Sequence, residues 1–334
     1  MKSEKDNLFT ACSYAEKLSE EAKSVFKTFP PDWNALYVRA IRDALAGKPL
    51  LLRRIRSVTA IDYPLPKGVS MREEKVPTPA GEMRVRLYFP DNNKEKLPAI
   101  FYVHGGGWCM GGIENCSLLC GKMAAELGAV VVVPEYRLAP ESPFPAALDD
   151  LCAAAKFLRE KAADYGIDSD EIYWSGDSAG AQLCLTAALR EIDRKTEALP
   201  KGIVLLYPVT QMLLVGENPI GSHAEFDKHS MLSNALLNAM TETYVGGFDR
   251  NLRELSPAGT SLAGLPPTLI LAAECDILCD DAANLAKKME RDGVPVTHKL
   301  LPGLPHAFAL LPGFDGAREC VFELIRKFRE SLKR

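Results

Sequence analysis

A serine set between two glycines is the residue best placed to do chemistry in this sequence. Residues 176–180 read Gly-Asp-Ser-Ala-Gly, between a short apolar run and a stretch with helical periodicity. A nucleophile on a tight strand-to-helix turn is held in a strained conformation, and the small neighbours Gly176 and Gly180 let that turn close. The helix start also brings backbone N–H groups beside the serine. G-x-S-x-G arises by chance in many proteins, but this position favours Ser178 as a nucleophile.

Three consecutive glycines follow a second apolar run. Residues 104–108 read His-Gly-Gly-Gly-Trp, directly after the run at residues 99–103. Without side chains, the backbone N–H groups of such a loop can approach a ligand oxygen, as an oxyanion hole requires. A phosphate-binding loop is the rival functional interpretation, but no Gly-Lys-Ser/Thr follows and no G-x-G-x-x-G pattern fits the site well. A flexible turn is the structural alternative.

A nucleophilic serine needs a base, and the sequence offers five histidines. One lies in the glycine loop, two lie between residues 209 and 255, and one lies inside a predicted strand. His306 instead follows a predicted strand, in a loop with proline and glycine upstream, and is the best-placed base. Asp276 directly follows another predicted strand and can orient that base. The chain order Ser178, Asp276, His306 is the order expected of an α/β-hydrolase.

The elements that must position these residues alternate between strands and helices. After about residue 73, short apolar runs are separated by amphipathic stretches. This alternation indicates an α/β fold with a mostly parallel central sheet and helices on both faces. The runs predicted as strands are 99–103, 130–133, 172–174, 203–206, 268–271 and 296–300, and two of the helical stretches are 118–127 and 148–158.

The remaining segments are predicted to form a hairpin and further helices. Residues 79–81 read Pro-Ala-Gly next to alternating apolar and charged residues, which is typical of a hairpin turn. Apolar residues repeat at spacings of three and four over residues 9–22, and a second helical pattern over 33–46 ends at Gly47. Residues 209 to about 255 are too many for a plain connection between strands, so they predict an insertion of helix and loop.

Length and composition are typical of an ordinary globular protein. The chain has 334 residues and 36.6 kDa, with 47% apolar and 25% charged residues and a formal net charge of −4. This length suits one large domain with a small appendage, and the charge gives no electrostatic case for binding nucleic acid or an anionic membrane. The charged N-terminus does not resemble a signal peptide, and the apolar stretch 129–133 is too short to span a bilayer. We expect a cytoplasmic protein.

The nine cysteines are an odd number for a disulfide framework, and no CxxC pair occurs. Cys109, Cys116 and Cys120 cluster at spacings of seven and four, which match no usual zinc pattern. We therefore expect buried thiols at these positions rather than a metal site. The serine chemistry described above needs neither a metal nor a cofactor.

Taken together, the motifs resemble those of the hormone-sensitive-lipase-like esterases, also called bacterial family IV, of the α/β-hydrolase superfamily. The resemblance covers roughly residues 70 to 330 and rests on segments 104–108, 135–141, 144–149, 176–180, 265–267, 276–280 and 306–308. It implies an α/β-hydrolase core under a helical cap. The cap would comprise an N-terminal segment and an insertion, residues 1–65 and 209–255, and the core would comprise residues 66–208 and 256–334.

The resemblance also implies roles for individual residues. Ser178 would be the nucleophile, His306 the base, and Asp276 the carboxylate that orients it. The oxyanion hole would be formed by the backbone N–H groups of Gly106, Gly107 and Ala179. The motif residues that support these groups are His104, Gly105, Gly176 and Gly180.

Three positions depart from the residues common in the family. Asp, His and Pro are frequent where this sequence has Glu135, Ser142 and Ile277. None of the three touches the proposed chemistry directly, so the implied activity class is unchanged. Three further residues are interpreted as structural, tying a strand to a loop through buried polar bonds: Tyr136, Arg137 and Asp149.

The implied activity is hydrolysis of a small-molecule ester with a short acyl chain, acetyl to about hexanoyl, through an acyl-enzyme. An acetylated sugar or a small metabolite is the candidate substrate. An apolar acyl pocket could be lined by Trp108, Met212, Leu213 and Leu214, although ordinary packing in the cap explains them equally well.

Two other functions stay open. A protein that only binds a small molecule in a capped pocket is one, and an amidase, lactonase or acyltransferase with the same triad is the other. A homodimer paired through the last predicted strand, residues 296–300, also stays open.

Overall fold

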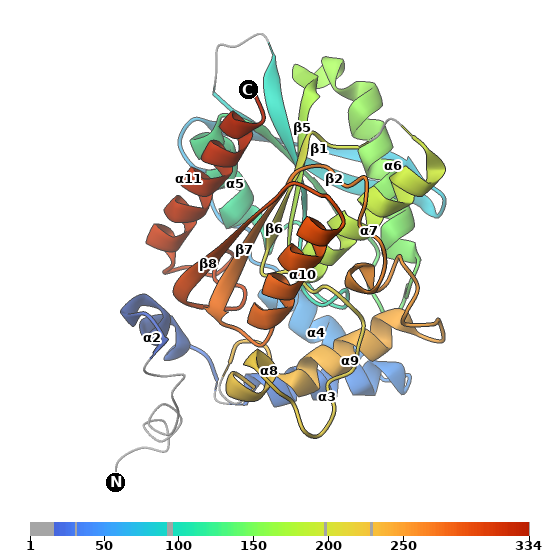
Figure 1. Cartoon of the computed structure of the whole chain (residues 1–334), viewed down its shortest axis with the longest axis vertical. Helices are drawn as coiled ribbons and strands as arrows, with labels where there is room; N and C mark the ends of the chain where they lie inside the picture. Colours follow the sequence, from blue (N-terminus) through green and yellow to red (C-terminus); the bar gives the residue numbers. More distant parts are fainter. Residues whose placement is uncertain (1–16, 31, 92–95, 197–198, 228–229, 334) are drawn as a thin grey trace.

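The chain is built around one mixed sheet. Figure 1 shows the computed structural model, which describes residues 17–30, 32–91, 96–196, 199–227 and 230–333. The strand order is β1-β2-β4-β3-β5-β6-β7-β8. The pairs β1–β2 and β2–β4 are antiparallel, and all pairs from β4 to β8 are parallel. The strands are β1 (Val69–Thr78), β2 (Gly81–Pro90), β3 (Leu97–Val103), β4 (Val130–Pro134), β5 (Ile167–Asp177), β6 (Gly202–Leu206), β7 (Thr268–Cys275) and β8 (Val296–Pro305).

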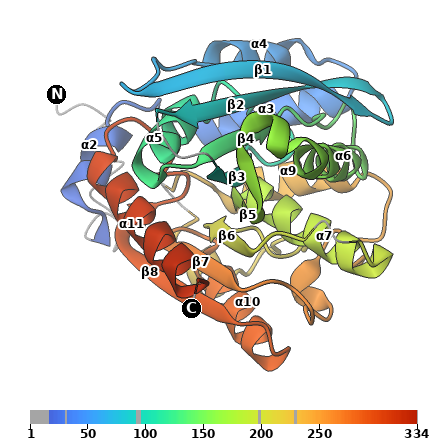
Figure 2. The same ribbon diagram turned by 90° about the horizontal axis from the view of Figure 1, so that it is seen from above.

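Helices cover both faces of this sheet. α5 and α11 lie on one face, and α6, α7 and α10 lie on the other, as two perpendicular views show (Figures 1 and 2). The two-sided covering of a mostly parallel sheet confirms the α/β fold predicted from the alternation of strands and helices. The covering helices are α5 (Ser117–Leu127), α6 (Ala146–Lys161), α7 (Ala179–Arg194), α10 (Cys279–Arg291) and α11 (Asp315–Ser331).

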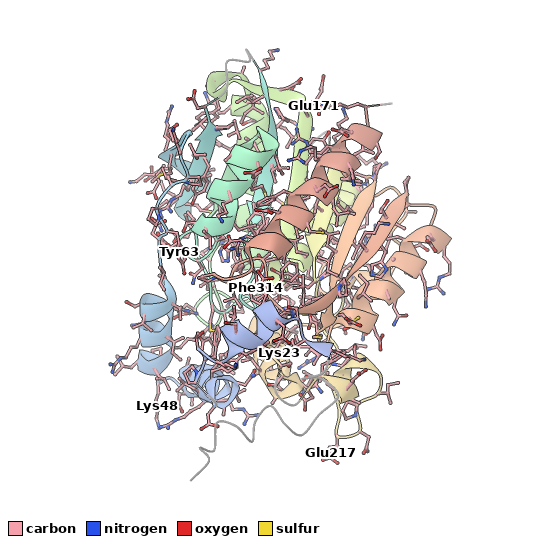
Figure 3. The ribbon with its side chains drawn as sticks, turned by 90° about the vertical axis from the view of Figure 1, so that its left-hand side faces the viewer. Lys23, Lys48, Tyr63, Glu171, Glu217 and Phe314 are labelled. Atoms are coloured by element: carbon pink, nitrogen blue, oxygen red, sulfur yellow. The ribbon has the colours of Figure 1, made fainter. Side chains whose placement is uncertain are left out.

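Further helices form a layer beyond the carboxyl ends of the parallel strands (Figure 1). They are α3 (Trp33–Leu45), α4 (Leu50–Thr59), α8 (Ser222–Glu225) and α9 (Asn234–Val245), while the short α2 (Glu20–Phe26) packs near β8. α3 contacts both α4 and α9, so segments far apart in the sequence share this layer. In Figure 3, Lys48 between α3 and α4 and Glu217 before α8 lie at the opposite end of the molecule from Glu171, in the first half of β5.

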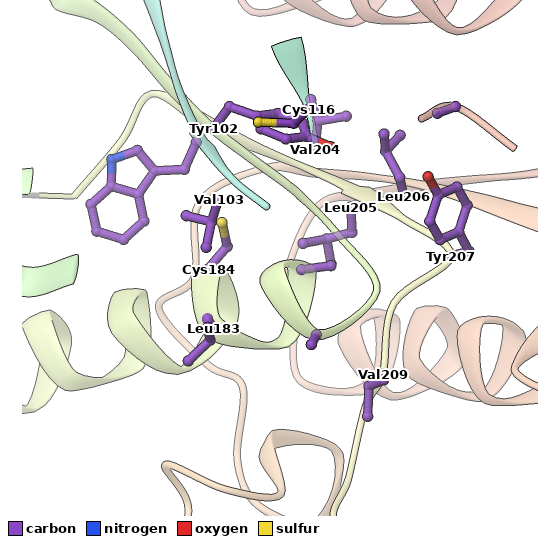
Figure 4. Packing of buried hydrophobic residues seen from close by; sticks show 14 of the residues in the cluster. Tyr102, Val103, Cys116, Leu183, Cys184, Val204, Leu205, Leu206, Tyr207 and Val209 are labelled. Atoms are coloured by element: carbon purple, nitrogen blue, oxygen red, sulfur yellow. The ribbon is translucent and has the colours of Figure 1, made fainter. Parts of the chain in front are cut away.

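The sequence explains how deeply each strand is buried. β4 reads Val-Val-Val-Val-Pro and is buried at every residue, as expected of a strand covered on both faces. β1 carries exposed charges over residues 72–75 and forms one edge of the sheet, where charge discourages pairing with other chains. Between the sheet and its covering helices lies a continuous apolar core, in which Val103 of β3 lies beside Cys184 of α7 (Figure 4).

The predicted strands are all present, and several extend beyond their apolar centres. The run 172–174 is the middle of β5, and 296–300 is the first half of β8, which lies at the sheet edge as expected. The hairpin turn at 79–81 joins β1 to β2, and the pattern over 33–46 corresponds to α3. Most of the predicted helix 9–22 lies outside the described residues. The segment 209–255 contains α8 and α9.

Helix α4 is a separate element that the sequence did not mark. It reads Leu-Leu-Leu-Arg-Arg-Ile-Arg-Ser-Val-Thr, with Leu52 and Ile55 buried but Leu50 and Val58 exposed. Leu52 and Ile55 lie three residues apart on one buried face, as in an amphipathic helix, but this short pattern was not separated from that of residues 33–46.

Candidate active site

The serine of the G-x-S-x-G segment lies on the sharp turn between β5 and α7. Ser178 has φ +54° and ψ −119°, a backbone conformation that residues with a side chain rarely adopt. Its N–H donates to the Leu206 carbonyl at 2.9 Å, and its carbonyl accepts from the Val209 N–H at 3.2 Å. Leu206 ends β6 and Val209 follows it, so the neighbouring strand fixes the backbone on both sides of the serine.

The two glycines of this turn are required by space. A Cβ at Gly176 would lie 2.6 Å from the carbonyl group of Gly180, and a Cβ at Gly180 would lie 2.1 Å from the Val103 carbonyl oxygen. These distances are far below van der Waals contact with backbone atoms. A side chain at Gly176 would therefore push β5 away from α7, and a side chain at Gly180 would push α7 away from the end of β3.

His306 and Asp276 approach the serine from the carboxyl ends of β8 and β7. His306 Nε2 lies 2.9 Å from Ser178 Oγ, and His306 Nδ1 lies 2.6 Å from Asp276 Oδ2. All three side chains are buried, and Asp276 also accepts the Leu278 N–H at 3.1 Å. A carboxylate only accepts, so Nδ1 carries the ring proton and Nε2 is free to accept the serine hydroxyl. The three residues predicted from chain order are therefore adjacent in space.

Tyr207 packs against this histidine. Its ring meets the imidazole of His306 edge-on, with centroids 5.0 Å apart at 62°, and also contacts Phe308. Tyr207 directly follows β6 and has φ +36°, so the backbone is strained where the ring turns toward the base. The sequence analysis did not single it out, although its position immediately after a predicted strand was the available signal.

The glycine loop presents its backbone N–H groups on one side and its carbonyls on the other. The Gly105 carbonyl accepts from His104 Nδ1 at 2.8 Å, and the Gly106 carbonyl accepts from the N–H groups of Cys109 and Met110 at 3.2 and 2.9 Å. In a trans peptide the carbonyl and the next N–H point in opposite directions. The N–H groups of Gly106 and Gly107 therefore point away from these partners, and neither has an acceptor in the described part of the chain.

No side chain fits at the two central glycines. Gly106 has φ +116°, and a Cβ there would lie 2.2 Å from the Met110 carbonyl oxygen. Gly107 has φ +59°, and a Cβ there would lie 2.0 Å from the sulfur of Met240, on α9. The loop thus needs glycine for its backbone conformation and because the helix α9 packs directly on it.

The N–H of Ala179 is a third donor beside the serine. Ala179 begins α7, and first-turn N–H groups have no carbonyl within their own helix to bind. The preceding carbonyl, that of Ser178, accepts from the N–H groups of Val209 and Gln182, both at 3.2 Å. The Ala179 N–H points away from those partners, and the helix start is a favourable place for a developing negative charge.

A nucleophile, a base, an orienting carboxylate and free donors at the carboxyl edge of such a sheet match one family. The model of the α/β-hydrolase fold matches residues 100–310 of this sequence. The chain belongs to the α/β-hydrolases, among the hormone-sensitive-lipase-like esterases.

Curated relatives of the chain are named as ester hydrolases. The carboxylesterase NlhH of Mycobacterium tuberculosis is 34% identical over 233 residues, which cover 68% of this chain and 71% of that protein. The ethyl acetate hydrolase of Pseudomonas putida is 33% identical over 228 residues, covering 67% of this chain and 70% of that protein. The chain is therefore a carboxylic ester hydrolase.

Solved structures support the same conclusion. The ester hydrolase EH1AB1 from the metagenome of Lake Arreo superposes with a TM-score of 0.81 at 26% identity. The superposition covers 95% of this chain and 100% of that one. Carboxyl esterase 2 from the fungus Tuber melanosporum superposes with a TM-score of 0.73 at 29% identity, over 82% of this chain and 91% of that one. The family resemblance drawn from the motifs is thus confirmed.

Asp177, between the glycine and the serine, links the serine turn to the glycine loop. Its Oδ1 accepts the Tyr102 hydroxyl and the Gly105 N–H, both at 2.7 Å. Burial raises the pKa of this carboxyl to about 6, and the two hydrogen bonds act against that rise. The sequence showed Asp177 only as the variable position of G-x-S-x-G, so its link to Gly105 was missed.

His104, the histidine of the glycine loop, is a structural residue in this arrangement. Burial lowers its pKa to about 4, so the ring is neutral near pH 7. The ring stacks on Tyr136 with centroids 4.2 Å apart at 13°, and the Tyr136 hydroxyl donates to the His104 carbonyl at 2.8 Å. These contacts fix the beginning of the loop and agree with the choice of His306 as the base.

The four residues expected at an acyl pocket lie in different surroundings. Trp108 is fully buried, stacks on Tyr244 of α9 at 4.9 Å and 10°, and donates from Nε1 to Gln182 Oε1 at 3.1 Å. Met212 is also fully buried, whereas Leu213 and Leu214 are 52% and 41% exposed. Trp108 thus packs between α9 and the core, and a pocket lined by these residues stays a prediction.

The three residues interpreted as structural all make polar bonds. Tyr136 ties a strand end to the glycine loop. Arg137 donates to Asp150 of α6 through Nε and Nη2, both at 2.8 Å. Asp149 pairs with Arg190 of α7, so it joins two helices rather than a strand and a loop.

The cysteine cluster is buried, as predicted. Cys109, Cys116 and Cys120 are fully buried, and burial raises the pKa of the Cys109 thiol to about 12. Over the described ranges, no three His, Cys, Asp or Glu side chains are grouped so that they could hold a metal ion. Within those same ranges, no helix has the length and apolar character needed to cross a membrane.

Proposed function

We propose that this chain is a serine carboxylesterase that hydrolyses short-chain acyl esters, acetyl to about hexanoyl, through an acyl-enzyme. The observation that carries the proposal is the unbroken chain of hydrogen bonds from Ser178 Oγ to His306, 2.9 Å, and from His306 to Asp276, 2.6 Å. It lies beside backbone N–H groups that have no acceptor in the described chain. Nucleophile, base, orienting group and oxyanion donors are then all in place.

The first half of the reaction forms the acyl-enzyme. His306 Nε2 takes the proton of Ser178 as Oγ bonds to the ester carbonyl carbon, and the carbonyl oxygen becomes an oxyanion. The N–H groups of Gly106, Gly107 and Ala179 would bind that oxyanion. Asp276 keeps the proton on Nδ1 and stabilises the imidazolium. The C–O bond to the alcohol then breaks, and the alcohol leaves with the proton from His306.

The second half releases the acid. Water gives a proton to His306 Nε2 as its oxygen bonds to the acyl carbon. A second oxyanion forms, and the same backbone N–H groups bind it. Collapse of this intermediate breaks the bond to Oγ and returns the proton to Ser178. The free enzyme and a carboxylic acid are the products.

Two observations support short acyl groups. Relatives are named for acetyl esters, among them the ethyl acetate hydrolase and an acetyl-hydrolase of Streptomyces hygroscopicus that is 34% identical over 209 residues. The serine is only 6% exposed, and Met240 of α9 packs on the glycine loop beside it. We assign the described parts of residues 1–65 and 209–255, which include α3, α4, α8 and α9, to a cap over the site. Such a cap favours small esters such as acetylated sugars or metabolites.

The test is hydrolysis of p-nitrophenyl esters from acetate to palmitate. We expect wild-type activity that falls with chain length beyond about hexanoate and is lost in Ser178→Ala. Ser175→Ala is the matched control, because Ser175 is buried on the same strand but its hydroxyl has no partner in the described chain. The proposal would be overturned if the wild type hydrolysed no ester and Ser178 did not react with a fluorophosphonate. That result would favour a binding role.

A further inference from the structure

Arg56 of α4 reaches the loop that carries two of the oxyanion donors. Its Nε donates to the Cys109 carbonyl at 2.8 Å, and its Nη2 donates to the Ala139 carbonyl at 2.6 Å. The same guanidinium pairs with both carboxylate oxygens of Glu141 at 2.9 to 3.1 Å. Its side chain is only 19% exposed, although half of the residues of α4 are exposed. The N-terminal helix is thus fastened to a loop 53 residues further along the chain.

The carbonyls that Arg56 holds belong to a closed arrangement. Trp108 and Cys109 are consecutive, and the Trp108 carbonyl accepts the Ala139 N–H at 2.9 Å. The next carbonyl, that of Cys109, accepts a hydrogen bond from Arg56 Nε. The carbonyl of Ala139 accepts one from Arg56 Nη2. Arg56 and Ala139 therefore hold two successive peptide groups of the loop from one side. A planar guanidinium can make these bonds together because its donors diverge at fixed angles.

This arrangement bears directly on the peptide groups of the donors. The Cys109 carbonyl that Arg56 holds shares its peptide group with the N–H of Met110, which donates to the Gly106 carbonyl at 2.9 Å. The Gly106 carbonyl in turn sets the direction of the Gly107 N–H. A shift of the Cys109–Met110 peptide would therefore rotate the Gly106–Gly107 peptide. Oxyanion stabilisation is sensitive to such rotation, because donors must lie at hydrogen-bond distance from the oxygen as charge develops.

We propose that Arg56 is a positioning residue for the oxyanion hole, acting through the carbonyls of Cys109 and Ala139 on the N–H of Gly107. The inference rests on the proposed esterase function of the same site. By this proposal, a residue of the N-terminal segment helps to stabilise the transition state and does not serve only as part of the cap.

The chain supplies a matched control on the same helix. Arg53 lies one turn before Arg56 and approaches the same Glu141 carboxylate at 4.0 Å, but its side chain is 65% exposed. In the described chain it makes no contact with the glycine loop. Arg53→Gln therefore removes a charge near Glu141 without touching the loop, whereas Arg56→Gln removes the bonds to both carbonyls. Arg56→Lys keeps the charge but not the planar set of donors.

The experiment measures kcat and KM on p-nitrophenyl acetate and the affinity for an aryl trifluoromethyl ketone. That ketone adds the serine reversibly, and its hemiketal oxygen occupies the oxyanion hole. We expect Arg56→Gln to lower kcat by about tenfold to a hundredfold and to leave KM within about twofold of the wild-type value. A displacement of about 1 Å in a catalytic group lowers the rate by up to about a hundredfold. The ketone affinity of Arg56→Gln should fall by a similar factor. Arg56→Lys should have a kcat and a ketone affinity between those of the wild type and Arg56→Gln. In Arg53→Gln, neither quantity should change by more than about twofold.

Three results would overturn the inference. One is a folded Arg56→Gln protein with wild-type kcat, and another is a kcat loss without any loss of ketone affinity. The third is an equal loss in Arg53→Gln. If Arg56→Gln does not fold, Arg56→Lys decides by the same criteria. A wild-type protein inactive on every ester would instead remove the proposed function itself, which separates the two failures.

Discussion

The serine turn and the glycine loop meet at one site but are held in different ways. The serine turn, residues 176–180, is fixed by its own glycines and by backbone hydrogen bonds to the end of β6. The glycine loop, residues 104–110, is held by side chains from distant segments. These are Arg56 of α4, Asp177 at the end of β5, Gln182 of α7, and Met240 and Tyr244 of α9.

This difference separates two requirements of the reaction. The nucleophile needs a particular backbone conformation, which a short strand-to-helix segment can encode by itself. The donors need to lie at a set distance from an oxygen that exists only during the reaction, so their support comes from the surrounding fold. Substitutions far from the glycine loop in sequence should therefore impair the donors while leaving the nucleophile intact.

The largest effect is expected on the serine side, from Asp276→Asn. An amide at this position can donate to Nδ1 and shift the ring proton to Nε2, so His306 no longer accepts the serine proton. We expect kcat on p-nitrophenyl acetate to fall by about 10⁴-fold with the melting temperature little changed. Asp281→Asn is the control, because Asp281 contacts His223 rather than His306. An Asp276→Asn enzyme that keeps more than about a tenth of kcat would contradict the assigned role.

On the loop side, Gly106→Ala should have the next largest effect. Its Cβ would lie 2.2 Å from the Met110 carbonyl oxygen at a φ of +116°, so the peptide must move and the donors with it. We expect a loss of about 10²- to 10³-fold in kcat, as for loss of one oxyanion donor. Gly112→Ala, two residues beyond the glycine loop, is the matched control, because the atom nearest to its Cβ would be 3.6 Å away. Similar losses in both variants would show general damage to the loop.

Asp177 joins the two regions and should make stability depend on pH. Burial raises its folded-state pKa from 3.8 to about 6, so the unfolded chain releases this proton at lower pH than the folded protein. The stability associated with the protonated group is fully present below pH 3.8 and is lost as pH rises through about 6. Relative to Asp177→Asn, the free energy of unfolding of the wild type should fall by about 2 kcal/mol between pH 4 and pH 7. Urea unfolding at each pH measures the free energy of unfolding of both proteins. The same pH dependence in the wild type and in Asp177→Asn would refute the prediction.

The smallest effect is expected where α9 meets the loop. The ring of Tyr244 stacks on Trp108, but its buried hydroxyl has no partner in the described chain. Tyr244→Phe keeps the stack, so kcat should be unchanged and the free energy of unfolding should change by less than about 1 kcal/mol. Tyr244→Leu loses the stack and should destabilise the protein by about 1–3 kcal/mol. Equal damage from both variants in thermal unfolding would assign the contact to the hydroxyl instead.

The comparison also explains what could be predicted from the sequence. β4 was predictable because four consecutive valines between helical patterns suit only a buried strand. Ser178, Asp276 and His306 could be selected because each comes a few residues after a predicted strand, and parallel strands bring such positions to one edge. Local patterns therefore sufficed for the sheet and for the side chains expected to react.

The supports of the glycine loop could not be found in this way. The contact of Arg56 with Cys109 spans 53 residues, and that of Asp177 with Gly105 spans 72. No pattern in either segment indicates which carbonyl or N–H its side chain will meet, because that depends on how helices pack. The partners of Asp149 and Asp150 could not be assigned for a related reason, since one position along a helix turns a side chain by about 100°.

The central claim is that Ser178 is the activated nucleophile of this site. Its most direct test is reaction of the whole protein with a fluorophosphonate, followed by intact mass and peptide mapping. We predict one adduct per chain, on Ser178, formed far more slowly in His306→Ala and not at all in Ser178→Ala. An unmodified protein, or an adduct on any other residue, would contradict the account.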